Sequence, residues 1–132
     1  MNRMKSVWVL ALMVICSLLA YLQYGLQPSA ADYRFDTAEW KSPTIVDGGD
    51  RTTRSYMCDD LLATHDFEGF TKQELFALLG SAESGGDFGF EQWDLVYWLG
   101  LERAGDFSLD DEVLGFDFDE AGRVIRYGTS TN

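Results

Sequence analysis

The sequence VLGFDFDEAGRVIRY, at residues 113–127 near the C-terminus, has the pattern of a β-hairpin. Its first half alternates apolar side chains with glycine or aspartate, as in a strand that buries one face (Leu114, Phe116, Phe118). Residues 119–122 follow as a turn sequence that ends in glycine, which tolerates the positive φ of a tight turn. The stretch therefore predicts two antiparallel strands, 113–118 and 123–127, joined as a hairpin.

A third strand is expected before this hairpin. Residues 94–102 are rich in aromatic and branched apolar side chains, which favour strands. Successive side chains of a strand point to opposite faces, so Leu95, Tyr97 and Leu99 should share one face and Trp98 should lie on the other. The polar, glycine-rich residues 81–90 before the strand predict a loop.

A helix with recognisable ends precedes that loop. Thr71 and Glu74 have the spacing of a capping box, in which each side chain accepts a hydrogen bond from the other residue's backbone N–H. Gly80 stands where a helix commonly ends. Between the two signals, apolar residues recur at helical spacing and form one stripe (Leu75, Leu78, Leu79).

The remaining segments complete the predicted domain. Apolar positions at helical spacing predict a second short helix at 55–65. Residues 32–54 show no sustained period and are interpreted as an extended linker arm, on which Trp40 could dock against the domain. The predicted fold class is thus α+β, with a domain at 55–132 in which two short helices pack on a three-stranded antiparallel sheet.

The first 31 residues have the pattern of a targeting segment. Arg3 and Lys5 precede an apolar run from Val7 to Leu22. This run predicts an N-terminal hydrophobic helix, which is either a signal peptide cleaved near Ala31 or a membrane anchor over residues 7–26. In both cases the cationic flank should stay in the cytoplasm, so residues after Ala31 are expected outside it, in the periplasm.

The charge balance restricts the partners of the chain. Its 22 acidic and 10 basic side chains give a formal net charge of −12. Since two of the basic residues precede the first acid, Asp32, the part from Asp32 onward has 22 acids against 8 bases. Such a surface repels phosphate backbones, which excludes nucleic acid as a partner. The 46% apolar content still suffices for a folded core.

The sequence shows no arrangement that predicts catalysis, a metal or a cofactor. His65 is the one histidine, and Cys58 is the one cysteine after the apolar run, which argues against a zinc site, a histidine-based triad and a disulfide framework. Residues 117–122 begin like a calcium loop, but position twelve would be Gly128 instead of glutamate. A solvated hairpin is favoured there over a weak cation site.

Five aromatic residues lie within eleven positions of the predicted loop and third strand, beside the acids Asp87, Glu91 and Asp94. One face of one strand cannot bury all of them. They are interpreted either as core and loop anchors or as an aromatic binding patch with an acidic rim, a composition typical of protein-recognition surfaces. The candidate partner-binding residues are Phe88, Phe90, Trp93 and Trp98.

Several of these motifs together resemble the SmpA/OmlA family of small bacterial envelope proteins. The resemblance extends over roughly residues 55–127 and is carried by the helix start and stop, the third strand and the hairpin (69–75, 78–80, 97–99, 114–119, 122–124). It implies a fold of two helices against a three-stranded antiparallel sheet, shared with the β-lactamase-inhibitor-protein group. It also implies a scaffold or binding role at the cell envelope.

These observations predict a non-enzymatic, exported module that binds another envelope protein as a binding or scaffold component. An inhibitor of a periplasmic or secreted enzyme is the alternative. A hydrolase acting through clustered carboxylates is disfavoured, because no positioned base or nucleophile is recognisable. The sequence leaves the partner's identity and the oligomeric state open.

Overall fold

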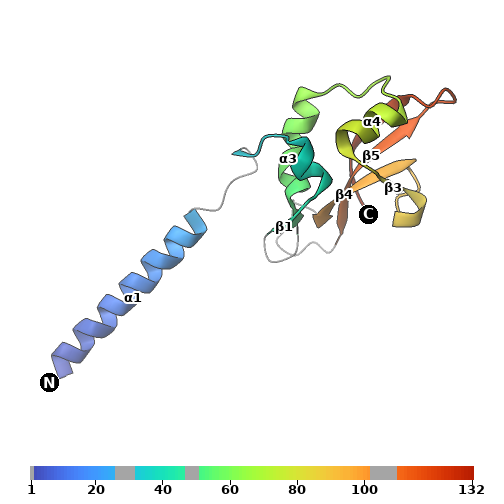
Figure 1. The fold of residues 1–132 in the computed structure, drawn as a ribbon. Coiled ribbons are helices and arrows are strands. Elements are labelled where there is room, and N and C mark those ends of the chain that lie inside the picture. The colour runs from blue at the N-terminus through green and yellow to red at the C-terminus, as the bar shows by residue number, and fades with distance from the viewer. Residues whose placement is uncertain (1, 26–31, 47–50, 102–109) are drawn as a thin grey trace.

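A computed structural model describes residues 2–25, 32–46, 51–101 and 110–132, with side chains described from Trp8 to Leu22 in the first range (Figure 1). The chain forms an N-terminal helix followed by an α+β domain. The helices are α1 (Asn2–Gly25), α2 (Thr37–Lys41), α3 (Thr53–Thr64), α4 (Lys72–Leu79) and the 3-10 helix η3 (Gly86–Phe88). The strands are β1 (Ile45–Val46), β2 (Arg51–Thr52), β3 (Glu83–Ser84), β4 (Leu95–Leu101), β5 (Asp111–Phe118) and β6 (Val124–Thr131).

The centre of the sheet is an antiparallel meander of β4, β5 and β6, as the sequence predicts. The hairpin between β5 and β6 closes through the Asp119 side chain, whose Oδ1 accepts a hydrogen bond from the backbone N–H of Arg123 at 2.9 Å. Gly122 has a φ of 75°, so the turn requires the conformational freedom of glycine at that position. The chain direction therefore reverses where the predicted turn lies.

The sheet nevertheless has six strands, and the expectation of three is wrong. The strand order is β1-β2-β4-β5-β6, with β3 also paired to β4. Strands β2 and β3 share one side of β4, since Arg51 pairs with Gly100 near its end and Ser84 pairs with Leu95 at its start. Each added strand has two residues, which is too short to show an alternating pattern in the sequence.

The segment 32–54 also differs from the predicted extended arm, because it contains α2, β1 and β2. Asp36 caps α2, its side chain accepting a hydrogen bond from the backbone N–H of Glu39 at 2.8 Å. Trp40 does dock as expected and is fully buried, edge-on to both Phe35 and Tyr97. The expectation of two short helices on the sheet must likewise be extended, because α2 lies beside α3 and α4.

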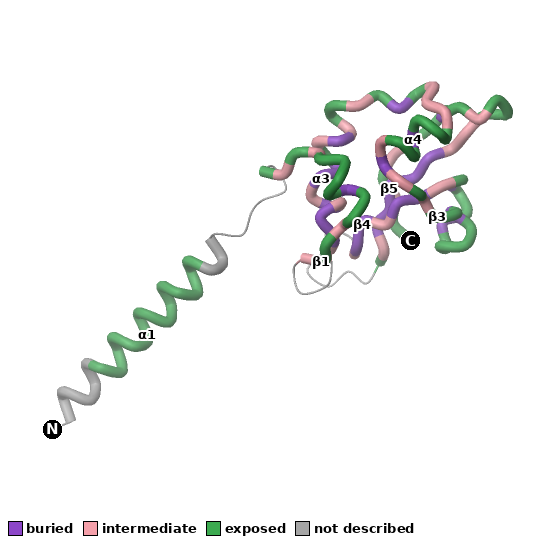
Figure 2. Tube along the Cα trace, in the orientation of Figure 1, coloured by how far each residue is buried: buried purple, intermediate pink, exposed green. Residues whose placement is uncertain are grey.

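A large hydrophobic core lies between the helices and one face of the sheet (Figure 2). It combines Met57 and Leu61 of α3, Leu75 and Leu79 of α4, and residues of the central strands (Tyr97, Leu99, Leu114, Phe116, Val124). Cys58 is buried in this core, in line with its interpretation as a small hydrophobic residue. The helical stripe and the strand alternation in the sequence thus identify the same apolar layer.

Helix α1 projects away from the domain (Figure 1), and its side chains from Trp8 to Leu22 are exposed. A hydrophobic N-terminal helix is therefore present, as predicted. Among the residues described, no helix combines the length and the apolar character needed to cross a membrane. The last residue of the predicted anchor, 26, and the predicted cleavage site before Asp32 lie outside the described residues.

Helix α4 begins and ends where the sequence predicts. Thr71 Oγ1 accepts a hydrogen bond from the N–H of Glu74 at 3.2 Å, and Glu74 Oε2 accepts one from the N–H of Thr71 at 2.8 Å. These hydrogen bonds hold the pKa of Glu74 below its usual range. At the other end Gly80 has a φ of 78°, and its N–H donates to the carbonyl of Phe76. The capping box is complete.

We expect Thr71→Ala to lower the free energy of unfolding by about 1 kcal/mol, because it removes the cap oxygen. Glu74→Ala should cost less, and the double variant less than the sum, since both residues form one box. Because the pKa of Glu74 is depressed, its contribution is present above the carboxyl's ordinary pKa and is lost as the pH falls through the folded-state value. Denaturant unfolding of residues 32–132, which contain the whole core, measures these effects. Strictly additive losses would contradict the box.

Candidate functional site

Strand β4 distributes its side chains between two cores. Tyr97 and Leu99 belong to the large core on the helix side, while Val96 and Trp98 lie on the opposite face, as the sequence predicts. The opposite face has its own small core of Phe90, Trp93, Val96 and Val113, with Trp98 packed against it. We call this the second core.

The second core is covered by the segment between α4 and β4, where a plain loop is expected. This segment contains β3 and η3, so that expectation is wrong. The N–H of Phe90 donates to the carbonyl of Gly85 at 2.7 Å, and the N–H of Trp93 donates to the carbonyl of Phe90 at 3.0 Å. A Cβ on Gly85 would lie 1.9 Å from the carbonyl oxygen of Trp93, so the turn has room for glycine alone. Residues 85–93 thus form a compact segment held by backbone hydrogen bonds within it. We call this segment the cover.

Two aspartates fasten this cover to the hairpin. The N–H of Asp94 donates to Asp117 Oδ1 at 3.0 Å, and the N–H of Phe118 donates to Asp94 Oδ2 at 2.9 Å. Asp117 also pairs with Arg126 through their side chains. The side chains of Asp117 and Asp94 therefore connect the end of the cover to β5 through hydrogen bonds.

Trp93 is held between the sheet and a cation. Its ring lies on Gly115 so closely that a Cβ on that glycine would be 2.2 Å from Trp93 Cδ2. The guanidinium carbon of Arg126 lies 4.2 Å from the Trp93 ring centroid, a cation–π contact, and its Nη2 donates to the carbonyl of Gln92 at 2.6 Å. Trp93 is accordingly 8% exposed and serves as a structural anchor.

The four candidate partner-binding residues thus divide into two pairs. Phe90 and Trp93 are buried in the second core, so their side chains anchor the cover. Phe88 is 37% exposed and stacks over Phe90, with 6.5 Å between the ring centroids. Trp98 is half-buried, and its indole N–H donates to Asp111 Oδ1 at 2.8 Å. The accessible aromatic surface is therefore Phe88 and Trp98, both bordering the second core.

The acidic rim is likewise divided. Asp87 and Glu91 are exposed in the cover, on either side of Phe88 in the sequence. The Asp94 side chain accepts a hydrogen bond from the backbone N–H of Phe118, and the Asp111 side chain accepts one from the indole N–H of Trp98. We define the aromatic–acidic surface as Phe88, Trp98, Asp87, Glu91 and Asp111. Its character suits a partner that offers apolar and cationic side chains.

The titratable residues of the large core have structural partners. Tyr97 donates its hydroxyl hydrogen bond to the carbonyl of Gly80 at 2.7 Å, and burial raises the pKa of Tyr97 above its usual value. Arg54 lies over the rings of Trp40 and Tyr97 and donates from Nε to the Trp40 carbonyl; burial lowers the pKa of this guanidinium. His65 sits between Phe35 and Phe67, beside the hydroxyl of Thr64. These groups join α2, α3 and the sheet.

Within the described ranges, no three His, Cys, Asp or Glu side chains gather closely enough to hold a metal ion. The candidate cation loop at 117–122 instead uses its first and third residues internally. Asp117 pairs with Arg126, and Asp119 accepts from the backbone N–H of Arg123. The hairpin is therefore present, and both carboxylates have partners within the domain.

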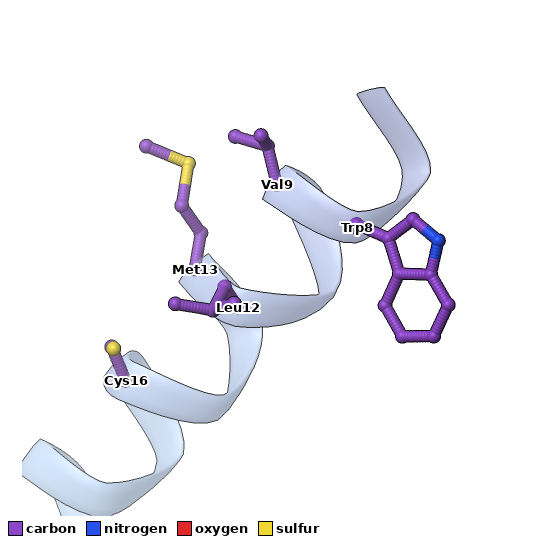
Figure 3. Close-up of a pocket in the computed structure, with 5 residues that line it drawn as sticks. All are labelled: Trp8, Val9, Leu12, Met13 and Cys16. Atoms are coloured by element: carbon purple, nitrogen blue, oxygen red, sulfur yellow. The ribbon is translucent and has the colours of Figure 1, made fainter. Parts of the chain in front are cut away.

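Helix α1 carries an apolar pocket (Figure 3), which is far in sequence from the aromatic–acidic surface and, unlike that surface, has no acidic residue in its lining. It is lined by side chains one helical turn apart (Trp8, Val9, Leu12, Met13, Cys16). All five are exposed on a helix that stands away from the domain, and none carries a charge. The pocket is part of the apolar surface of the N-terminal helix.

Comparison with known proteins returned no matching family model, curated protein or solved structure. The resemblance to the SmpA/OmlA family therefore stays a prediction based on the motifs.

Sequence reasoning did not identify Gly115 or Arg126 as supports of the surface. Gly115 occupies an outward position in an alternating strand, where a small residue has no evident role until Trp93 is placed on it. Arg126 is 34 positions from Gln92, and no local pattern links them. One signal was present: a glycine in a strand often marks the close approach of another group.

We expect Gly115→Ala to lower the free energy of unfolding by about 1–3 kcal/mol, because the added methyl overpacks the second core against Trp93. Gly128→Ala is the matched control. Gly128 is the cross-strand partner of Gly115, and an added Cβ there meets nothing within 4 Å, so its effect should stay within about 0.5 kcal/mol. Denaturant unfolding compares the two. Equal effects would show that Trp93 does not lie on Gly115.

Proposed function

We propose that this chain is a non-enzymatic protein-binding module of the bacterial cell envelope, and that its partner docks on the aromatic–acidic surface. The observation that carries the proposal is the placement of Phe88 and Trp98. One is exposed and the other half-buried, on the sheet face remote from α3 and α4, with acids beside both. Tryptophan is among the residues that most often contribute large binding energies, and phenylalanine is enriched in the cores of protein interfaces.

The contacts that hold Phe88 and Trp98 in place support this proposal. The cover that bears Phe88 is fixed by its own backbone hydrogen bonds and by Asp94 and Asp117. Trp98 is held by Asp111 and by the second core. Side chains that are already ordered lose little conformational entropy when a partner binds, so more of the contact energy appears as affinity.

The charge of the surface defines the chemistry of the partner. Asp87 and Glu91 flank Phe88 in the sequence and are exposed, in a chain of formal net charge −12. A partner surface with lysine or arginine around an apolar centre is complementary, and electrostatic attraction would speed the encounter. Binding to such a surface should weaken as salt is added, because the charges are screened.

Export of the domain completes the proposal. Arg3 and Lys5 precede the apolar segment, which favours an orientation with residues 32–132 outside the cytoplasm. In this account residues 1–31 direct export and are then either retained as an N-terminal anchor or removed near Ala31. A periplasmic location and an SmpA/OmlA-like scaffold role agree with each other, and both belong to the proposal.

The test compares two equally exposed phenylalanines. Phe88 is 37% exposed on the aromatic–acidic surface, and Phe76 is 38% exposed on α4. Tagged full-length protein is isolated from solubilised membranes, and the proteins retained with it are quantified by mass spectrometry. Phe88→Ala should weaken retention of the main partner by about 2 kcal/mol, roughly thirtyfold, whereas Phe76→Ala should leave it unchanged. Phe88 is the better probe than Trp98, because truncating half-buried Trp98 also removes its hydrogen bond to Asp111.

If both variants retain the partner equally well, the surface is not the docking site. Recovery of a single soluble enzyme, lost with Phe88→Ala, would replace the scaffold role by the inhibitor alternative. Recovery of a membrane assembly supports the scaffold role.

A further inference from the structure

Strand β6 forms one end of the sheet. Its inner side pairs with β5 from Glu112–Thr131 to Phe118–Val124. Its outer side is occupied at the first residue, where the N–H of Val124 donates to the carbonyl of Phe70 at 2.8 Å and its carbonyl accepts from Gly69 at 2.9 Å. Beyond Val124, none of the described strands pairs with this outer edge.

The edge lacks the features that usually prevent pairing with another strand. Such features are short length, proline, charged side chains and bulges. Strand β6 has eight residues and no proline, and its one charged side chain, Arg126, is paired with Asp117. Its register shift lies at the start, opposite Asp117 and Phe118, so residues 127–131 pair regularly with β5. These five residues are uncharged (Tyr127, Gly128, Thr129, Ser130, Thr131).

The charge pattern indicates what kind of partner this edge suits. Residues 121–132 contain two arginines and no acid, whereas all 22 acids lie before them. The side chain of Arg126 is already paired with Asp117. A cationic partner would be attracted to the acidic parts of the chain. It would find no electrostatic attraction to a strand that contains no acid. An acidic partner, in contrast, meets no like-charge repulsion from the residues of β6 themselves; the acid that contacts the start of this stretch is Asp66, whose Oδ1 accepts a hydrogen bond from the Tyr127 hydroxyl at 3.3 Å.

We propose that two copies of this chain associate through β6, which pairs antiparallel with the β6 of the second copy and continues the sheet across the dimer. A second copy is an acidic partner that presents the same open, acid-free edge. A two-fold symmetric contact uses the same patch on both subunits, and it makes the two strands antiparallel. The main-chain hydrogen bonds of strand addition supply the attraction.

This interface uses the main-chain edge of β6, whereas the aromatic–acidic surface uses side chains of the cover and of the sheet face. The two are neighbours, because Gln92 of the cover accepts a hydrogen bond from Arg126 and donates one to Ser130 Oγ at 3.0 Å. The dimer would therefore present two copies of the binding surface at once. The inference does not depend on the identity of the partner proposed above.

Cysteine cross-linking in the full chain tests the dimer. Cys16 is exposed and is replaced by alanine, whereas buried Cys58 is kept. Single cysteines are placed at each position from 127 to 131, and the protein in detergent micelles is oxidised. Opposed residues of antiparallel strands have Cα atoms about 4.5–5.5 Å apart, within the range that a disulfide spans. We expect a cross-linked dimer at the β6 position nearest the two-fold axis and a declining yield on either side of it.

Thr64→Cys, at an exposed position at the end of α3, is the control and should remain monomeric. Addition of Thr129→Glu to the cross-linking variant should lower its yield several-fold, because it places like charges in the seam. Added salt should raise the yield, since it screens the repulsion between two acidic domains. That direction is opposite to the salt effect expected for the cationic partner at Phe88.

Three results would overturn the proposal. The first is the absence of cross-linking at all five positions, whether the mass in detergent is that of a monomer or of a dimer held by α1. The second is equal cross-linking at Thr64. The third is cross-linking of β6 in intact membranes to a protein other than this chain. None of these results bears on the comparison of Phe88 with Phe76, so the two proposals fail separately.

Discussion

Strand β4 alternates between two hydrophobic cores, with Tyr97 and Leu99 on the helix side and Val96 and Trp98 on the other. Each face must be covered, because apolar side chains on both sides of a strand cannot remain in water without a large loss of stability. Helices α3 and α4 cover the first face. The segment from Gly85 to Trp93 covers the second, and Phe88 of this segment and Trp98 of β4 lie at the border of that core. The accessible aromatic surface follows from the way the second core is closed.

Features whose cause is local could be predicted from the sequence. The capping box of Thr71 and Glu74, the helix stop at Gly80 and the turn glycine at position 122 depend on residues a few positions apart. Strand alternation correctly divided β4 into two faces. The three two-residue strands could not be predicted, because each forms through pairing with a distant segment and not through a pattern of its own.

The candidate site was predictable in composition and not in arrangement. Four aromatic residues were recognised, but which of them are buried depends on Gly115 and Arg126, which meet Trp93 only through the folding of the hairpin. Trp40 shows the same limit in the large core, since its burial rests on Tyr97 and Arg54 from other elements. Acidic residues that looked equivalent in the sequence also have different roles: Asp94 and Asp117 fasten the cover, whereas Asp87 and Glu91 stay exposed.

Trp93 closes the second core, and this arrangement leaves Trp98 accessible at the border of that core. Hydroxyl-radical footprinting of the full chain, read residue by residue by mass spectrometry, tests it most directly, because the rate of oxidation follows the exposure of each side chain. We expect Trp98 to be oxidised several-fold faster than Trp93, with fully buried Trp40 as an internal reference for protection. Oxidation of Trp93 at the same rate as Trp98 would contradict this expectation.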